Sequence, residues 1–238
     1  MHRTNFNRIS LALFIIISSC ETDPTSLLCR LTSLTIVDGG SPVTQTYVYD
    51  GGKLSRMTST SGDDSFQINY QYDDEGDLAK TFLIVSGDSV VTSYSHNNLH
   101  YVVASLFAHN GDTTETTYEY NLNGQLIRQR QDVVSAGVPA AIVTTYYTYP
   151  DLSTHNPSII ATVDIADSVV VHYEYDNKIN PERGLYLPNI QPYNNITRVT
   201  GPTYEYAITY QYDSNGLPVS SLSTTGRTQN WVYICQVL

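Results

Sequence analysis

The sequence has few of the residues on which many enzymes and metalloproteins depend. Its 238 residues include 3 Cys, 2 Met and 1 Trp. No two cysteines have C-x-x-C spacing, and there is no G-x-S-x-G elbow, phosphate-binding P-loop or dinucleotide fingerprint. These absences argue against redox, nucleotide-dependent and serine-hydrolase chemistry. We therefore expect that the protein is not an enzyme and carries no cofactor.

A pattern typical of metal binding is also missing. Beyond the N-terminal segment the histidines are scattered, at His96, His100, His109, His155 and His172. A zinc site needs three or four ligands that converge. The acidic run 73–77 lacks the D-x-D-x-D-G spacing of a calcium loop and is explained as a turn. The sequence predicts no metal. Carboxylate pairs that assemble only in three dimensions leave a hydrolase as a distant alternative.

Positive charge is scarce. There are 12 Lys and Arg against 23 Asp and Glu, which gives a net charge of −11. Nucleic acids and anionic membranes attract basic surfaces, so neither is expected as an electrostatic partner. Neutral or cationic small ligands fit this balance better.

Hydrophobic runs long enough to span a bilayer as a helix are absent, since such a span needs about 20 residues. The one apolar run, residues 11–17, follows Arg3 and Arg8 and ends in Ser18-Ser19-Cys20. This pattern is typical of a secretory signal peptide, and its end resembles a lipobox. The resemblance implies cleavage after Ser19 and acylation of Cys20. The acyl chains would then attach the protein to a membrane. We predict a signal peptide at 1–19, a tether at 20–26 and one β domain at 27–238.

Tyrosine is abundant, with 20 residues against 5 Phe. A unit of the form Tyr-x-Tyr-Asp/Asn-x-x-Gly-x-Leu recurs about every 24 residues. Two tyrosines separated by one residue lie on the same face of a strand. The Asp or Asn and the Gly are typical of a tight turn. Its four best copies begin at Tyr47, Tyr70, Tyr118 and Tyr210.

Alternation is clearest near the C-terminus, where Tyr204, Tyr206, Ile208, Tyr210 and Tyr212 share one face. Such a period of two predicts a strand and not a helix. No segment combines an N-cap, a period of 3.6 and a Gly stop. The chain is therefore predicted to be all-β, an antiparallel meander of about 13–16 strands. We expect a water-soluble closed or nearly closed barrel, with a curved open half-barrel as the alternative and a transmembrane pore disfavoured because the face opposite the tyrosines is polar.

The tyrosine unit resembles the YD repeats of bacterial Rhs-type shell proteins. The whole chain resembles a family of uncharacterised bacterial lipoproteins with a porin-like β-barrel fold. That resemblance implies a lipid-anchored protein of the cell envelope, at the outer membrane and facing either the periplasm or the cell surface. It supplies no catalytic residues.

Two cysteines remain if Cys20 is acylated. Cys29 and Cys235 lie at opposite ends of the predicted domain, and export places them where disulfides persist. We predict that they are bonded, which favours a closed sheet. A proline-rich segment, 177–203, breaks the repeat and is predicted to be a long loop, either a plug over the barrel mouth or a surface excursion.

Two functions remain open from the sequence. The tyrosine stripe could simply stabilise a structural envelope protein. Alternatively, a tyrosine-lined inner face could bind a carbohydrate, lipid or peptide in the lumen. For the second function the candidate ligand-binding residues are Tyr204, Tyr206, Tyr210 and Tyr212. An inner cavity with exposed aromatic rings and converging polar groups would favour binding.

Overall fold

The computed structural model describes residues 27–183, 185 and 192–237. Within this part of the chain there are sixteen β-strands and no helix, so none of it forms a helix able to cross a membrane. The strands are β1 (Leu27–Val37), β2 (Val43–Asp50), β3 (Lys53–Ser61), β4 (Asp64–Tyr72), β5 (Leu78–Val85), β6 (Asp88–His96), β7 (Val102–His109), β8 (Asp112–Tyr120), β9 (Leu126–Ser135), β10 (Val138–Thr148), β11 (Ile159–Val163), β12 (Ser168–Ile179), β13 (Asn194–Thr200), β14 (Glu205–Tyr212), β15 (Pro218–Ser223) and β16 (Thr228–Val237).

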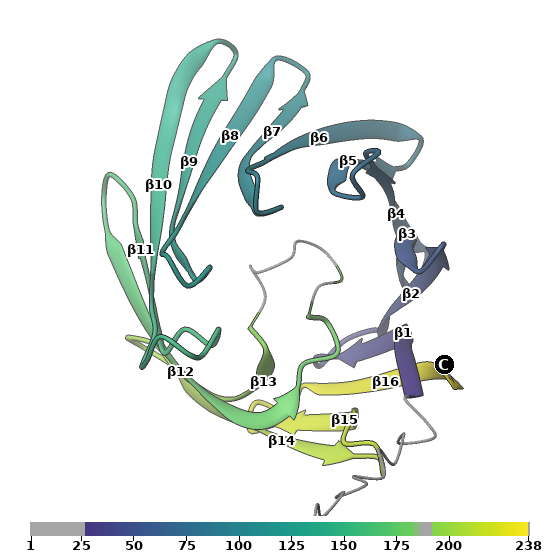
Figure 1. Ribbon diagram of the computed structural model, residues 1–238. Helices are drawn as coiled ribbons and strands as arrows, with labels where there is room; N and C mark the ends of the chain where they lie inside the picture. Colours follow the sequence, from purple (N-terminus) through teal and green to yellow (C-terminus); the bar gives the residue numbers. More distant parts are fainter. Residues whose placement is uncertain (1–26, 184, 186–191, 238) are drawn as a thin grey trace, which may run out of the picture.

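The sheet is a closed antiparallel barrel. Each strand pairs with its neighbours along the chain, and β1 also pairs with β16 (Figure 1). The prediction of an all-β meander is therefore confirmed, at the upper end of the expected strand number, and the open half-barrel is excluded. Closure leaves no free sheet edge at which another chain could pair.

A disulfide lies at the seam where the barrel closes. Cys29 and Cys235 are directly opposite in the register of β1 and β16, with their Cα atoms 4.0 Å apart, and they are bonded. The pairing that the sequence predicted is present. It joins residues 206 positions apart, so one covalent bond links the two ends of the sheet. Cys20 lies outside the described residues, and its acylation stays a prediction.

The two ends of the barrel differ. At one end, which we call the hairpin end, pairs of strands are joined by tight turns. Several of these turns have only two residues: 62–63, 86–87 and 110–111. At the other, the loop end, lie the start of β1, the end of β16 and the connections that follow each Tyr-x-Tyr unit. The tyrosines and turn residues of each repeat unit are therefore concentrated at the loop end.

Four connections at the loop end have the same hydrogen-bond pattern. In each, the first residue accepts bonds through its side-chain Oδ1 from the backbone N–H groups two and four positions later, at 2.8–3.1 Å. The fourth residue has a positive φ, between 62° and 91°. We call these the Asx loops, and they comprise residues 73–77, 97–101, 121–125 and 213–217.

A tyrosine closes seven of the eight hairpins at the loop end. It is the second tyrosine of the unit in five of them, the first (Tyr210) in β13–β14, and Tyr233, two residues after Trp231, in β15–β16. The tyrosine hydroxyl donates to a backbone carbonyl near the start of the preceding strand, as Tyr72 does to Leu54 at 2.9 Å and Tyr120 to Val102 at 3.0 Å. Seven such bonds follow the rim, and we call them the tyrosine girdle: Tyr49–Leu31, Tyr72–Leu54, Tyr120–Val102, Tyr149–Leu126, Tyr175–Pro157, Tyr210–Ile196 and Tyr233–Pro218.

Most carbonyls of the girdle belong to buried residues. Leu31, Leu54, Val102 and Leu126 are each at most 4 % exposed. Each tyrosine thus covers an apolar residue with its ring and satisfies a carbonyl with its hydroxyl. Burial raises the pKa of six of the girdle phenols above the usual value for tyrosine, so they stay protonated hydrogen-bond donors at neutral pH: Tyr72, Tyr120, Tyr149, Tyr175, Tyr210 and Tyr233.

The long connection is shorter than the sequence predicted. The structure extends β12 to Ile179 and begins β13 at Asn194, so residues 180–193 connect the strands and not 177–203. The prolines led to the wider predicted range for the loop. However, β13 forms without a Tyr-x-Tyr unit of its own. It pairs with β12 and with β14 through Val199, which is 3 % exposed.

Candidate functional site

The β12–β13 connection turns inward. In Figure 1 its described residues lie inside the ring of strands. Leu185 packs against a buried cluster on the wall near the seam, which contains Leu31, Leu34 and Trp231. A sixteen-strand barrel is too wide for wall side chains alone to fill. Asn180, Glu182 and Pro192 of the connection form one side of a cavity.

The base of this connection is fixed by side chains of the β10–β11 connection. The Oδ1 of Asn156 accepts hydrogen bonds from the backbone N–H groups of Tyr193 and Asn194, at 2.9 and 3.1 Å. His155 stacks on Tyr193 with ring centroids 4.3 Å apart, and the guanidinium of Arg183 lies 3.4 Å from the centroid of the same ring. Two connections distant in the sequence therefore support each other.

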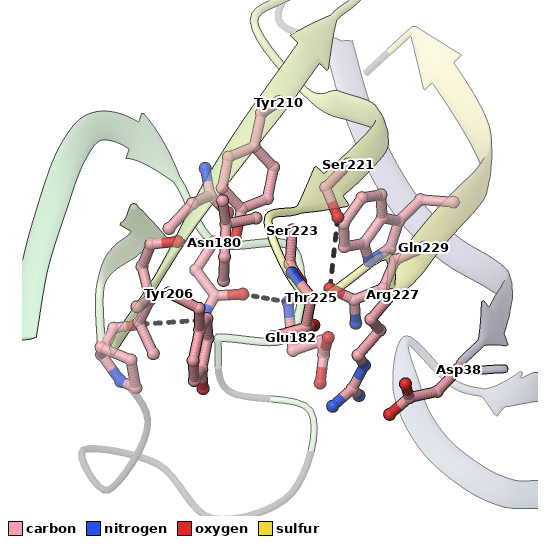
Figure 2. Close-up of a pocket in the computed structure, with 15 residues that line it drawn as sticks. Asp38, Asn180, Glu182, Tyr206, Tyr210, Ser221, Ser223, Thr225, Arg227 and Gln229 are labelled. Atoms are coloured by element: carbon pink, nitrogen blue, oxygen red, sulfur yellow. Dashed lines mark hydrogen bonds between the residues drawn. The ribbon is translucent and has the colours of Figure 1, made fainter. Parts of the chain in front are cut away.

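A cavity of about 500 Å³ lies between this connection and strands β13–β16. Figure 2 shows the aromatic rings of Tyr206 and Tyr210 facing hydroxyl, amide and charged groups across it. Asp38 and Arg227 belong to hairpin-end turns, so the cavity extends toward that end. Its polar lining comprises Asp38, Asn180, Glu182, Asn195, Ser221, Ser223, Thr225, Arg227 and Gln229.

One charged group lies deep in the cavity. Glu182 is largely surrounded by protein but keeps a partly exposed surface toward the lumen. Burial raises the pKa of the Glu182 carboxyl, while the indole of Trp231 and the positive charge of Arg227 act in the opposite direction. In Figure 2 the Arg227 side chain extends toward Asp38 and Glu182. The site is therefore polar at its centre and contains charged groups that a polar ligand could contact.

Trp231 provides a nearly buried indole donor. Its side chain is 6 % exposed, and its Nε1 makes no hydrogen bond of normal geometry to any described residue, although the Glu182 carboxyl lies near it. The ring packs 6.0 Å from Tyr210, centroid to centroid. A buried donor without an acceptor costs free energy unless something else supplies one. A bound ligand or an ordered water would do so here.

The four tyrosines predicted to bind ligand have different environments. Tyr206 and Tyr210 line the cavity, although the Tyr210 hydroxyl also belongs to the girdle. Tyr212 donates to the carboxylate of Asp176 and supports the wall. Tyr204 is 47 % exposed and lies beside Tyr206, with ring centroids 6.3 Å apart. The structure thus brings two of the four into the cavity.

The rest of the cavity was not identified from the sequence. Trp231, Glu182 and Arg227 come from a strand, a connection and a turn that are brought together only when the barrel closes. The one signal available was that the chain has a single tryptophan and that it follows the repeat parity of Tyr233.

The architecture agrees with known structures. The chain is similar in fold to porin-like proteins of Bacteroides. A porin-like protein from Bacteroides uniformis ATCC 8492 superposes with a TM-score of 0.61 at 15% sequence identity, over 89% of this chain and 98% of that one. One from Bacteroides vulgatus ATCC 8482 has a TM-score of 0.45 at 13% identity, over 87% of this chain and 99% of that one.

No protein-family model and no curated protein matches the sequence. At 15% identity the likeness establishes the barrel fold and nothing about ligand or location.

Proposed function

We propose that this protein is a lipid-anchored component of the bacterial cell envelope that binds a small hydroxyl-rich ligand, such as an oligosaccharide, in the lumenal cavity. The observation that carries the proposal is a cavity in which the rings of Tyr206 and Tyr210 and the nearly buried indole of Trp231 face hydroxyl, amide and charged groups. Aromatic faces pack against the apolar faces of sugar rings, and the surrounding amides and hydroxyls match their hydroxyl groups.

Charge on the lining favours this ligand class over a lipid. Glu182, Arg227 and Asp38 would be costly to bury against an acyl chain. Hydroxyl groups can accept from Trp231 and from the guanidinium, and donate to the carboxylates. We propose binding without catalysis.

The outer wall supports a barrel surrounded by water. Strand neighbours form ion pairs there, Arg128 with Glu119 at 2.6 Å and Arg198 with Glu205. A lipid-facing wall would carry a continuous apolar band, whereas here exposed apolar residues such as Leu106 and Ile234 share the wall with these ion pairs. We propose that the acyl chains on Cys20 meet the membrane. Replacing Cys20 by Ala should then move the protein from the membrane fraction to the soluble fraction, and unchanged partitioning would contradict the anchor.

Binding can be measured directly because Trp231 is the only tryptophan. We expect the fluorescence of the purified protein to shift on titration with a member of a panel of α- and β-linked oligosaccharides. Tyr206→Ala should weaken binding at least tenfold. Tyr146→Ala, a change at a tyrosine that is 46 % exposed, should leave it unchanged and is the matched control.

Native mass spectrometry provides a second measurement, because a tightly held ligand would remain bound through purification. Unchanged fluorescence with the whole panel, together with a mass equal to that of the processed chain alone, would reject ligand binding. The structural role would then be favoured, with the tyrosine girdle as its basis.

A hydrolase remains the second candidate because one observation favours it. Glu182 has a raised pKa, as a general acid requires, and Asp38 lines the same cavity. The same incubations test it by product analysis. Shortened oligosaccharides with wild-type protein, and none with Glu182→Gln, would establish hydrolysis.

A further inference from the structure

The fourth position of the Asx loops has the same neighbour in each of three consecutive loops. It lies beside the residue twenty-three positions earlier in the chain, which comes directly before the first buried apolar residue of the preceding odd-numbered strand. Gly76 lies beside Lys53, whose Nζ donates to the Gly76 carbonyl at 2.8 Å, and Gly124 lies beside Tyr101. A Cβ at Gly76 or Gly124 would overlap the neighbour's side chain. Glycine therefore suits this position by its positive φ and by the space available.

One loop departs from this pattern. Residues 97–101 carry His100 at the glycine position, with a φ of 62°, and its neighbour is Asp77. The Nδ1 of His100 lies 2.7 Å from an Oδ of Asp77. In the hairpin that precedes this loop, His96 occupies the second position of the unit, where the other seven hairpins have a tyrosine. Both departures place imidazoles at one point of the rim.

Carboxylates converge at this point. One ligand atom each of Glu75, Asp77 and His100 lies within 4.8 Å of the other two. A cavity of about 620 Å³ is lined by these residues together with Asp73 and His96. The Oδ1 of Asp73 accepts a hydrogen bond from the Asp77 N–H at 2.8 Å, which fixes the backbone of this loop.

We propose that Glu75, Asp77 and His100 bind a divalent transition-metal ion such as Zn²⁺. Zinc accepts imidazole nitrogen and carboxylate oxygen at about 2.0–2.2 Å. Ligand atoms on such an ion lie roughly 3–3.5 Å apart, so small movements of partly exposed side chains complete the geometry. His96 or water takes the fourth position. Imidazole distinguishes this site from one for Ca²⁺ or Mg²⁺, which prefer oxygen ligands only.

The repeat supplies a variant that tests the site without damaging the fold. His100→Gly restores the residue that Asx loops 73–77, 121–125 and 213–217 carry at this position, at a φ that glycine adopts readily. His109→Gln, at the hairpin end, is the matched control for losing one histidine.

The experiment is calorimetric titration of the purified, EDTA-treated protein with Zn²⁺ at pH 7.5, with circular dichroism and thermal melts to verify folding. We expect one equivalent bound by the wild type. His100→Gly and Asp77→Asn should each weaken binding at least tenfold, whereas His109→Gln should not change it.

Three outcomes would overturn the proposal. These are no saturable binding of Zn²⁺ by the wild type, equal binding by the folded His100→Gly variant, or Ca²⁺ competing for the site as well as Zn²⁺ does. Since Trp231 lies in a different cavity, ligand binding there and zinc binding here can succeed or fail independently.

Discussion

Two halves of the barrel differ in regularity. From β2 to β9 the second position of each unit advances by 23 or 24 residues, at Tyr49, Tyr72, His96 and Tyr120. From β10 to β16 the spacing is uneven, and connections 149–158 and 180–193 interrupt it. Both halves nevertheless have the same antiparallel pairing and contribute to the same tyrosine girdle.

The difference shows where the chain can change without loss of closure. In the regular half, every hairpin has at its own end an Asx loop, a girdle bond or both. In the irregular half, the two longer connections satisfy each other, through Asn156 and Tyr193, and one of them enters the lumen. The repeat therefore builds the wall, and the insertions create the cavity.

Removing the disulfide should affect this comparison most. In the Cys29→Ser, Cys235→Ser double variant we expect the free energy of unfolding to fall by roughly 4 kcal/mol, because the bond closes a very long loop of the unfolded chain. Hydrogen exchange should rise first in β1, β15 and β16, while β4–β8 stay protected. Chemical denaturation and exchange mass spectrometry measure the two effects. Simultaneous loss of protection in both halves would show that the barrel opens as one cooperative unit.

A smaller effect tests whether the girdle is continuous across the halves. Tyr120→Phe in the regular half and Tyr233→Phe in the irregular half each leave a carbonyl without its donor, and each should cost about 1 kcal/mol. Tyr146→Phe, on the exposed outer wall, should change stability by less than about 0.5 kcal/mol. Urea denaturation gives all three values. If only Tyr120→Phe destabilises, the girdle is a property of the regular half alone.

Much of the wall was predictable from the sequence because its determinants are local. The alternation from Tyr204 to Tyr212 fixes which face is inward, and the Asp or Asn before each Gly fixes where the strands reverse. Closure required one long-range relation, which the cysteines at opposite ends of the domain supplied.

The site was less accessible because nothing local marks it. Glu182 is one acid in a proline-rich segment, and Arg227 is one turn residue among many. They lie near Trp231 only because β16 closes on β1 and the β12–β13 connection turns inward. His100 likewise becomes a candidate metal ligand only because the fold places it beside Asp77.

The smallest effect concerns the cavity of the irregular half. Because the pKa of Glu182 is raised in the folded protein, the folded state binds this proton more tightly than the unfolded state does. The resulting stabilisation is complete below the ordinary pKa of a glutamate and is lost as the pH rises through the raised value. Glu182→Gln cannot ionise, so its stability relative to the wild type should increase between pH 4 and pH 8. Thermal melts at several pH values measure this difference, and Glu115→Gln, at an exposed strand position, should show no such trend. Parallel curves for the wild type and Glu182→Gln would mean that water in the lumen solvates the carboxylate fully, and that the cavity is less sheltered than the regular wall around it.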